Sequence, residues 1–375
     1  MRPKPNIDSL PVYKPGKPIE EVRREFGLAD VIKLASNENP FGCSPKAKEA
    51  IAREFDHLHL YPDGASVELA NALSERLGVG PDWLVFGAGS DEVVALIARA
   101  FFVRGDETVM AFPTFPQYRH NAEVEGAVVR EVPLRDGKHD LPAMLACVGA
   151  RTKVVWVCNP NNPTGTIVTR DELESFLRRV PDDVLVVLDE AYCEYNTSDD
   201  YPDGIELLKR YGNLVVLRTF SKIYGLAALR IGYGVGRPEV IRLIQQVREP
   251  FNTSRVAQAA AKAALEDESF VSESRARNAE GIRQLTAAFD RMGLAYYPAY
   301  GNFVMVDVGR SAGEVFERLL RRGIIVRHDP TWRLPTKLRV TVGSREQNEA
   351  FLSALSAVLA EVPEQAPHGT AVWAE

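Results

Sequence analysis

The stretch Val184-Leu185-Val186-Val187-Leu188-Asp189-Glu190-Ala191-Tyr192 decides the fold, because a wholly apolar run ends directly on a carboxylate. Five consecutive Val and Leu residues have the length of one strand, and a strand that is apolar on both faces is typical of a buried parallel sheet. A carboxylate at the end of a buried strand is costly unless it is hydrogen-bonded or paired with a cation. Asp189 is therefore a candidate functional residue, and the alternative is that it caps a following helix.

Four other short apolar runs follow the same pattern, and polar or aromatic residues come directly after each run. The segments between the runs read as helices, and one of them begins at Thr169, which with Glu172 predicts a capping box. This alternation predicts an α/β fold with a mostly parallel, buried sheet. Such sheets bind ligands at the carboxyl ends of their strands, so we expect the residues after the runs to form one site. The runs are residues 84–86, 109–112, 154–157 and 214–217.

The end of the chain has a different pattern, which predicts a smaller α+β unit. Residues 302–308, 324–327 and 337–342 read as strands, and residues 314–322 and 345–361 read as helices. We therefore expect an N-terminal arm or part of the small domain at residues 1–30, a large domain at 31–270, a small C-terminal domain at 271–362 and a loose tail at 363–375.

Composition and charge exclude several classes of protein. Hydrophobic residues make up 45% and charged residues 26% of the 375 residues, which is typical of a globular protein and not of a disordered chain. With 45 Lys and Arg residues against 51 Asp and Glu residues, the net charge is −6, so the chain lacks the basic excess of a nucleic-acid-binding protein. The longest apolar-leaning stretch, residues 93–103, contains Arg99 and is far too short to span a membrane.

The cysteines and histidines predict neither a disulfide framework nor a metal site. The four cysteines lie far apart without a Cys-x-x-Cys pair, which indicates reduced thiols in a cytoplasmic protein. The six histidines form no i, i+4 pair that would bind a metal ion from one helix face. Residues 1–17 contain no apolar segment of the kind found in signal peptides.

Two glycine- or lysine-containing motifs follow predicted strands and are open to two interpretations each. Gly87-Ala88-Gly89-Ser90 could present backbone N–H groups to a phosphate, or form only a tight turn. It does not complete Gly-x-Gly-x-x-Gly, because Glu92 occupies the last position, so a nicotinamide dinucleotide site is not supported. Lys222 would alone most often be a surface lysine, but with Ser221 and Arg230 it could lie at a phosphate site.

The motifs Asn162-Pro163-Thr164-Gly165, Asp189-Glu190-Ala191-Tyr192 and Ser221-Lys222 with Arg230 follow one another in the chain. As an ordered set they resemble pyridoxal-phosphate-dependent aminotransferases of fold type I. That resemblance implies a large domain with a mostly parallel central sheet and a small α+β domain. A finer resemblance is to the histidinol-phosphate branch of the family, from about residue 10 to about residue 359, with Ala88 as a departure where the family more often has Asn. The finer resemblance rests on residues 34–42, 61–64, 89–92, 218–222 and 338–343.

The resemblance assigns a role to each catalytic candidate. It implies that Lys222 forms a Schiff base with pyridoxal 5′-phosphate and then acts as the base at the substrate Cα. It implies that Asp189 pairs with the protonated pyridine nitrogen, and that Asn162 and Tyr192 hydrogen-bond the phenolic oxygen of the ring. Phe115 would stack on the ring face. The other expected cofactor-binding residues are Gly89, Ser90, Asp91, Thr219, Ser221 and Arg230, together with Tyr61 contributed by the partner subunit of a homodimer.

The resemblance also implies the substrates. Arg339 would bind the α-carboxylate of glutamate, because a planar guanidinium recognises a carboxylate with two hydrogen bonds. Arg327 would bind the substrate phosphate or the side chain of glutamate, and Tyr13 and Asn37 are further candidates for the pocket. The expected reaction is transfer of the amino group of L-histidinol phosphate to 2-oxoglutarate, which gives imidazole-acetol phosphate and L-glutamate in histidine biosynthesis.

Four other functions compete with this one. A broad aromatic amino-acid aminotransferase and a decarboxylase similar to the threonine-phosphate enzymes would both use the chemistry of Lys222. A catalytically silent member of the fold is disfavoured because Lys222, Asp189, Asn162, Tyr192 and Arg230 are all present. A nicotinamide oxidoreductase is disfavoured because the dinucleotide motif is incomplete.

Overall fold

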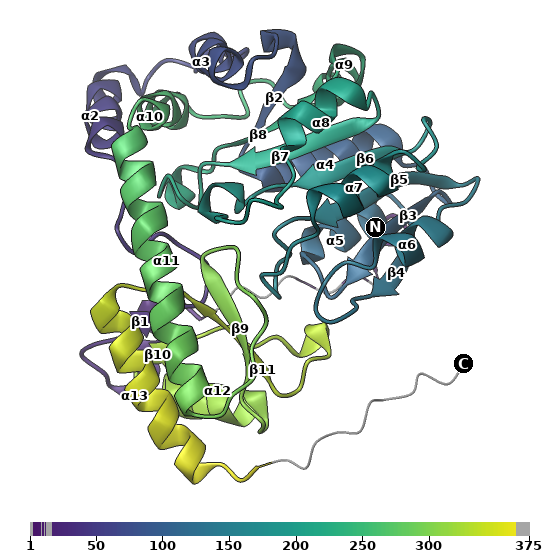
Figure 1. Cartoon of the computed structure of the whole chain (residues 1–375). Coiled ribbons are helices and arrows are strands. Elements are labelled where there is room, and N and C mark those ends of the chain that lie inside the picture. Colours follow the sequence, from purple (N-terminus) through teal and green to yellow (C-terminus); the bar gives the residue numbers. More distant parts are fainter. Residues whose placement is uncertain (1–2, 9, 11, 13–16, 365–375) are drawn as a thin grey trace.

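The computed structural model describes residues 3–8, 10, 12 and 17–364 of the chain. A seven-stranded sheet with its helices forms the larger part, and a smaller α+β unit lies beside one edge of it (Figure 1). Helix α11 (Glu268–Arg291) runs from the larger part to the smaller one. The α/β fold with a small α+β unit that the sequence predicts is confirmed.

The strand order of the large sheet is β2-β8-β7-β6-β5-β3-β4. Strand β8 is antiparallel to both of its neighbours, and the six other strands run in one direction. All five runs predicted as strands are present and parallel to one another, so the residues that follow them meet at one edge of the sheet. The strands are β2 (Leu84–Gly87), β3 (Glu107–Phe112), β4 (Val128–Pro133), β5 (Thr152–Cys158), β6 (Leu185–Asp189), β7 (Leu214–Thr219) and β8 (Gly232–Gly236).

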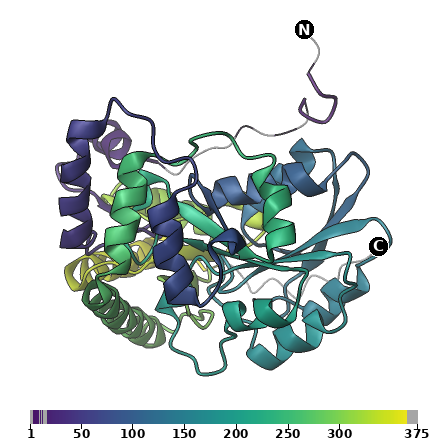
Figure 2. The same ribbon diagram turned by 90° about the horizontal axis from the view of Figure 1, so that it is seen from above.

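Helices cover both faces of the sheet, which explains why its central strands carry apolar residues on both sides (Figure 2). One face packs against α4 (Ser90–Phe101), α5 (Pro116–Val124) and α9 (Pro238–Gln245). The predicted capping box is present at the start of α7, where Thr169 and Glu172 exchange hydrogen bonds. The other face packs against α6 (Leu141–Ala146), α7 (Arg170–Leu177), α8 (Gly204–Arg210) and, beyond them, α2 (Pro45–Glu54), α3 (Val67–Leu77) and α10 (Arg255–Leu265).

Strands β4 and β8 are absent from the sequence-based prediction. Strand β8 reads Gly-Tyr-Gly-Val-Gly, and three glycines in five residues are unfavourable for a strand. The fold requires Gly232 because a Cβ there would lie 2.4 Å from the backbone nitrogen of Ser90. The missing side chain lets the loop before α4 approach the sheet closely, so local propensity gives way to a packing requirement.

The smaller unit is built around the antiparallel pair β9 (Phe303–Asp307) and β11 (Lys337–Thr341). Short strands β1 (Ile32–Lys33) and β10 (Ile324–Ile325) pair in parallel beside it. Its core lies between these strands and three helices, one of which is α11. The remaining helices are α1 (Ile19–Phe26), α12 (Ala312–Leu320) and α13 (Arg345–Glu361).

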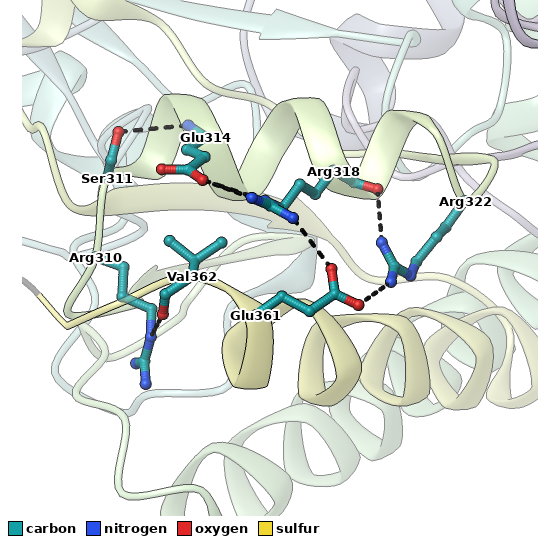
Figure 3. A network of polar contacts seen from close by, with 7 residues as sticks. All are labelled: Arg310, Ser311, Glu314, Arg318, Arg322, Glu361 and Val362. Atoms are coloured by element: carbon teal, nitrogen blue, oxygen red, sulfur yellow. Dashed lines mark hydrogen bonds and ion pairs between the residues drawn. The ribbon is translucent and has the colours of Figure 1, made fainter.

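Ion pairs on the surface of this unit tie its last helix to α12. Arg318 and Arg322 of α12 both pair with Glu361 at the end of α13, at 3.3 and 2.5 Å (Figure 3). Arg310, just before α12, donates a hydrogen bond to the carbonyl oxygen of Val362 at 2.7 Å. Exposed pairs of this kind contribute little each, so the apolar core of the unit supplies most of its stability.

The expected domain limits stay a prediction. The limit near residue 270 falls in the first turn of α11, and β1 pairs with β10 of the smaller unit. Tyr13 and residues 365–375 of the expected tail lie outside the described residues. No helix in the described ranges has the length and apolar character needed to cross a membrane.

Candidate active site

A cavity of about 350 Å³ lies where the carboxyl edge of the large sheet faces the smaller unit. Its walls contain fourteen of the sixteen side chains and glycines that the sequence predicts for the site. The predicted residues that line it are Asn37, Gly89, Ser90, Asp91, Phe115, Asn162, Asp189, Tyr192, Thr219, Ser221, Lys222, Arg230, Arg327 and Arg339. Of the other two, Tyr61 does not line the cavity, and Tyr13 lies outside the described residues.

Asp189 is the last residue of β6 and is 4% exposed. Its two carboxylate oxygens accept hydrogen bonds from the hydroxyl of Tyr118, at 2.6 Å, and from the backbone N–H of Ala191, at 3.1 Å. Burial outweighs these bonds and raises the pKa of Asp189 to about 6. The carboxylate therefore lines the cavity as a buried group whose charge lacks full compensation, and a cationic ligand atom would stabilise it.

Lys222 follows β7 and lies on the same side of the sheet edge as Asp189. Its Nζ is 3.4 Å from the carbonyl oxygen of Ser36 and 5.4 Å from the centre of the Tyr192 ring. Burial, assisted by the positive charge of Arg339, lowers the pKa of Lys222 to about 8. A substantial fraction of the amine is thus uncharged near neutral pH, which is the form that a nucleophile or general base needs.

A cationic corner of the cavity combines Arg230 with the start of α4. The guanidinium of Arg230 lies 3.3 Å from the hydroxyl of Ser221 and 3.4 Å from the carboxylate of Asp91. Gly89 precedes α4 with φ of 78°, and a Cβ there would lie 2.5 Å from a nitrogen of Arg230. Glycine therefore lets the helix N-terminus and Arg230 lie side by side, an arrangement that favours an anion such as a phosphate.

Tyr192 and Asn37 form a buried polar pair in the wall of the cavity. Asn37 donates to the Tyr192 hydroxyl at 3.0 Å, and Thr341 donates to the Asn37 side-chain oxygen at 2.9 Å. Asn37 has φ of 56°, a left-handed conformation that Asn tolerates better than most residues. Asn302 and Thr341 hold its backbone carbonyl and N–H at 2.9 Å each, so the neighbouring strands of the small unit fix this conformation.

Arg339 lies in the middle of β11, is 7% exposed and is held on all sides. It donates to the side-chain oxygen of Asn162 at 2.5 Å and to the carbonyl oxygen of Ala35 at 2.6 Å. Its guanidinium carbon lies 5.4 Å from the ring centre of Phe303 and 5.6 Å from that of Trp332. Arg339 is therefore a preorganised cation with a fixed plane, which suits a carboxylate or phosphate.

Arg327 lies opposite Arg339 and has a different environment. The two residues exchange backbone hydrogen bonds at 2.9 Å in each direction. The Arg327 side chain pairs with Asp329 at 3.0 Å, and Asp329 also lines the cavity. A second anion-binding group thus stands next to the first, already paired with a carboxylate of the same chain.

Tyr61 is the one described candidate that does not line this cavity. It is 79% exposed and stacks on Phe251 with a distance of 4.8 Å between ring centres. Several of its neighbours are also apolar and exposed, namely Phe55, Leu58, Leu60 and Val67.

Tyr118 is absent from the sequence-based prediction, and Asp329 and Trp332 belong to it only as part of the irregular loop 329–336, which we expect could alter the substrate pocket. Tyr118 is fully buried in α5 and stacks on Trp156 with 4.9 Å between ring centres, and nothing in the sequence distinguishes it from a core tyrosine. Asp329 caps η5 (Pro330–Trp332), and Trp332 is the last residue of that turn. Asp329 lies two residues after Arg327, and the Trp332 ring faces the guanidinium of Arg339, but no periodic pattern in the sequence assigns either contact.

The donor set fits pyridoxal phosphate. Asp189 is a buried carboxylate that a protonated ring nitrogen would compensate, and Arg230, Ser90, Ser221 and the start of α4 form a place for a phosphate. Lys222 is an amine with a lowered pKa in the same cavity. Among the described residues no three His, Cys, Asp or Glu side chains are grouped so that they could hold a metal ion.

Comparison with known proteins agrees with this geometry. The family model "Aminotransferase class I and II" matches residues 29–355. A histidinol-phosphate aminotransferase of Geobacillus sp. (strain WCH70) is 56% identical over 361 residues, which cover 96% of this chain and 99% of the relative. That of Bacillus subtilis (strain 168) is 53% identical over 360 residues, with 96% and 100% covered.

A solved structure shows the same similarity in three dimensions. The histidinol-phosphate aminotransferase of Sinorhizobium meliloti, in complex with pyridoxal 5′-phosphate, superposes with a TM-score of 0.89 at 31% identity and covers 96% of this chain and 98% of its own. The chain belongs to the class I and II aminotransferases, within them to the family of histidinol-phosphate aminotransferases, and it is a pyridoxal-phosphate-dependent enzyme.

Proposed function

We propose that the protein transfers the amino group of L-histidinol phosphate to 2-oxoglutarate and so forms imidazole-acetol phosphate and L-glutamate in histidine biosynthesis. The observation that carries the proposal is the pair Arg339 and Arg327, which face the cavity that also contains Lys222 and Asp189. Both substrates are anionic, and two neighbouring guanidinium groups suit a phosphate as well as a carboxylate. The relatives at more than half identity carry the name of this activity.

We propose the following roles for the residues of the cavity. Pyridoxal phosphate, when bound, supplies an electron sink for the electron pair released at the substrate Cα. Asp189 holds the proton on the ring nitrogen, since this pairing stabilises both charges. Asn162 and Tyr192 donate hydrogen bonds to the phenolic oxygen, and Phe115 packs against the ring. The phosphate is held by Gly89, Ser90, Asp91, Thr219, Ser221 and Arg230.

Lys222 is proposed as the residue that removes the proton from the substrate Cα. Its lowered pKa, about 8, leaves part of the amine free to accept a proton at neutral pH. Arg339 holds the carboxylate or phosphate of the substrate in a fixed plane, because Asn162, Ala35 O and two aromatic rings fix its guanidinium. Orientation of the substrate in this way places Cα within reach of Lys222. Asn37 supports Tyr192, and Tyr13 stays a candidate for the pocket.

Spectroscopy of the half reaction tests the function. The purified protein, loaded with pyridoxal phosphate, is mixed with L-histidinol phosphate or with L-tyrosine, and the visible absorbance is followed as the cofactor becomes pyridoxamine phosphate. Histidinol phosphate should react with a kcat/KM at least about 100-fold above that of tyrosine, because only it brings a phosphate to the two arginines. Equal rates would instead assign a broad aromatic aminotransferase. Release of CO2 from threonine phosphate without a keto product would assign a decarboxylase.

We further propose that the active form is a homodimer in which Tyr61 reaches the phosphate site of the partner subunit. The exposed apolar residues close to Tyr61 in the sequence, Phe55, Leu58, Leu60 and Val67, support this, because apolar side chains that gather on a surface are often covered by a partner. Mixing the inactive variants Tyr61→Ala and Lys222→Ala should restore activity, since each mixed dimer has one site with both residues intact. Absence of restoration, with mixed dimers shown by mass spectrometry, would refute the shared site. A cytoplasmic location stays a prediction.

A further inference from the structure

Two arginines, Arg327 and Arg339, lie side by side in the part of the cavity wall that the small unit forms. Arg327 and Arg339 form a hydrogen-bonded backbone pair, with N–H to carbonyl distances of 2.9 Å in both directions. Residues directly opposite each other project to the same face of a sheet, and like charges in that position repel. Both side chains line the cavity. An anion on or near this face would relieve the repulsion between them.

The structure compensates the two arginines in different ways. Two of the groups that hold the Arg339 guanidinium are neutral, namely the Asn162 side-chain oxygen and the carbonyl oxygen of Ala35. Arg327 is held by an anion, the carboxylate of Asp329, at 3.0 Å. The side chains of this pair are 20% and 21% exposed, so both are half-buried in the wall of the cavity.

Asp329 is itself fixed by the turn in which it lies. Its Oδ1 accepts hydrogen bonds from the backbone N–H of Thr331 at 3.0 Å and from the Thr331 hydroxyl at 2.6 Å. Its other oxygen, Oδ2, is the one that faces Arg327. Although burial acts in the opposite direction, the hydrogen bonds from Thr331 and the charge of Arg327 lower the pKa of Asp329, so it is ionised at neutral pH.

The substrates of an aminotransferase at this site differ in how many anionic groups they bring. Glutamate and 2-oxoglutarate carry two carboxylates, whereas an aromatic amino acid carries one. A second anionic group needs a cation, and an uncharged side chain next to an unpaired, desolvated cation is unfavourable. A site with a permanently free Arg327 would therefore exclude uncharged side chains, and a site without Arg327 would bind the second anion weakly.

We propose that Asp329 is a specificity-determining residue that serves as an internal counter-anion for Arg327, and that the second anionic group of a substrate displaces it. This inference rests on the proposed function only in so far as amino acids are donors at this site. With an uncharged side chain bound, the Arg327–Asp329 pair stays intact and the cavity wall is neutral there. With glutamate bound, Arg327 pairs with the side-chain carboxylate and Asp329 remains on its two Thr331 donors.

The variant Asp329→Asn tests the proposal because it removes the charge and keeps the shape. The kcat/KM of the half reaction is measured for L-glutamate and for L-tyrosine. We expect the ratio of glutamate to tyrosine to rise on the order of ten-fold, because glutamate no longer competes with an internal carboxylate while tyrosine meets an unpaired cation. Since the ratio compares two substrates on one protein, partial loss of folded enzyme does not affect it.

Binding of unreactive acids provides a second measurement that needs no turnover. The dissociation constants of maleate, a dicarboxylate, and 3-phenylpropionate, a monocarboxylate, are measured by calorimetry on the enzyme loaded with pyridoxal phosphate. Asp329→Asn should tighten maleate binding and weaken that of 3-phenylpropionate. Thr331→Val, which removes one donor to Asp329, should change the ratio less, because the carboxylate itself remains.

A matched control is Asp307→Asn in the same unit. Asp307 pairs with Lys337 and is similarly half-buried, but neither residue lines the cavity, so the substrate ratio should stay at the wild-type value. In an Arg327→Gln background the effect of Asp329→Asn should vanish. An unchanged ratio in Asp329→Asn, or an equal loss with both substrates, would overturn the proposal. Neither result depends on whether histidinol phosphate is the preferred donor, so the two hypotheses fail separately.

Discussion

The two halves of the cavity are built in different ways. The half from the large sheet places Asp189 at the end of β6 and Lys222 three residues after β7, and these strands are fixed by ladder hydrogen bonds and by apolar contacts on both faces. The half from the small unit places Arg339 on a two-stranded pair and Asp329 in an irregular turn. We infer that the rigid half suits the chemical step, which tolerates little displacement, and that the other half suits recognition of substrates of different charge.

The same contrast holds for electrostatics. In the large-sheet half, burial acts against the charged forms, so the pKa of Asp189 is raised to about 6 and that of Lys222 is lowered to about 8. In the small-unit half, Arg327 and Asp329 compensate each other, and the pKa of Asp329 is lowered. In the first half, a bound group can supply the missing charges, whereas in the second the Arg327–Asp329 pair is neutral before the substrate binds.

The largest effect is expected for Lys222→Ala, which removes the only proposed base from the rigid half. Turnover should fall by roughly four orders of magnitude, at the upper end of what a general base contributes. The rate of the half reaction with L-histidinol phosphate is the measurement. Lys262→Ala is a suitable control, because Lys262 is an exposed lysine paired with Glu68 and should leave the rate unchanged. Full activity of Lys222→Ala would contradict the proposed role of Lys222 as the base at the substrate Cα.

The two halves also differ in how well they could be predicted from the sequence. Asp189 and Lys222 follow apolar runs that read as buried strands, and parallel strands bring their carboxyl ends to one edge, so a local pattern was enough to place them together. The partners of Arg339 come from segments far apart in the sequence, such as Asn162 and Ala35, and the partner of Arg327 lies in the irregular turn at Asp329, so no local pattern indicates them. Tyr118 and β8 were missed for a related reason, since only tertiary packing explains a hydroxyl aimed at Asp189 and three glycines in a strand.

The next largest loss of activity is expected for changes to Arg339 and Trp332, in the half of the cavity that the small unit forms. Arg339→Lys should lower kcat/KM for L-glutamate about 100-fold, because an ammonium group cannot reproduce the planar contacts with Asn162 and Ala35 O and leaves the Asn162 oxygen without its donor. Trp332→Leu, which removes one ring face from Arg339, should cost about ten-fold, and Trp332→Phe should recover most of it. Steady-state kinetics with both substrates measure these losses. Recovery of activity by lysine would show that charge alone, and not the fixed plane, binds the carboxylate.

A third prediction concerns the free energy that the buried, charged carboxylate of Asp189 costs the folded protein when no cofactor is bound. The pKa of Asp189 in the folded protein, about 6, lies above the ordinary value near 4, so its contribution to stability is present at low pH and is lost as pH rises through about 6. Asp189→Asn should therefore stabilise the cofactor-free protein by on the order of 2 kcal/mol at pH 8 and by little at pH 4.5. Urea denaturation at both pH values tests this. A variant that is less stable at pH 8 would show that Tyr118 and Ala191 N already compensate the charge.

The smallest effect we expect comes from Tyr118, which acts on the reaction only through Asp189. The hydroxyl of Tyr118 donates to the carboxylate and lowers its pKa, so Tyr118→Phe should raise that pKa further. Because Asp189 must be ionised to hold a protonated ring nitrogen, the acid limb of the kcat/KM profile should move to higher pH, with a loss of about ten-fold at pH 6 and less at pH 8.

A comparison variant separates this effect from a general loss of stability. Tyr201→Phe also removes a hydroxyl that donates a hydrogen bond, in this case to the carbonyl oxygen of Asn159, but Tyr201 does not line the cavity. It should lower the midpoint of urea denaturation without moving the acid limb. A shift of the limb in both variants would mean that packing of the sheet, and not the hydrogen bond to Asp189, sets the pH dependence. A shift of the acid limb in Tyr118→Phe alone would show that α5, as well as the strand ends, helps to set the ionisation of Asp189. It would also explain why a tyrosine that no local sequence pattern indicates lies at this position.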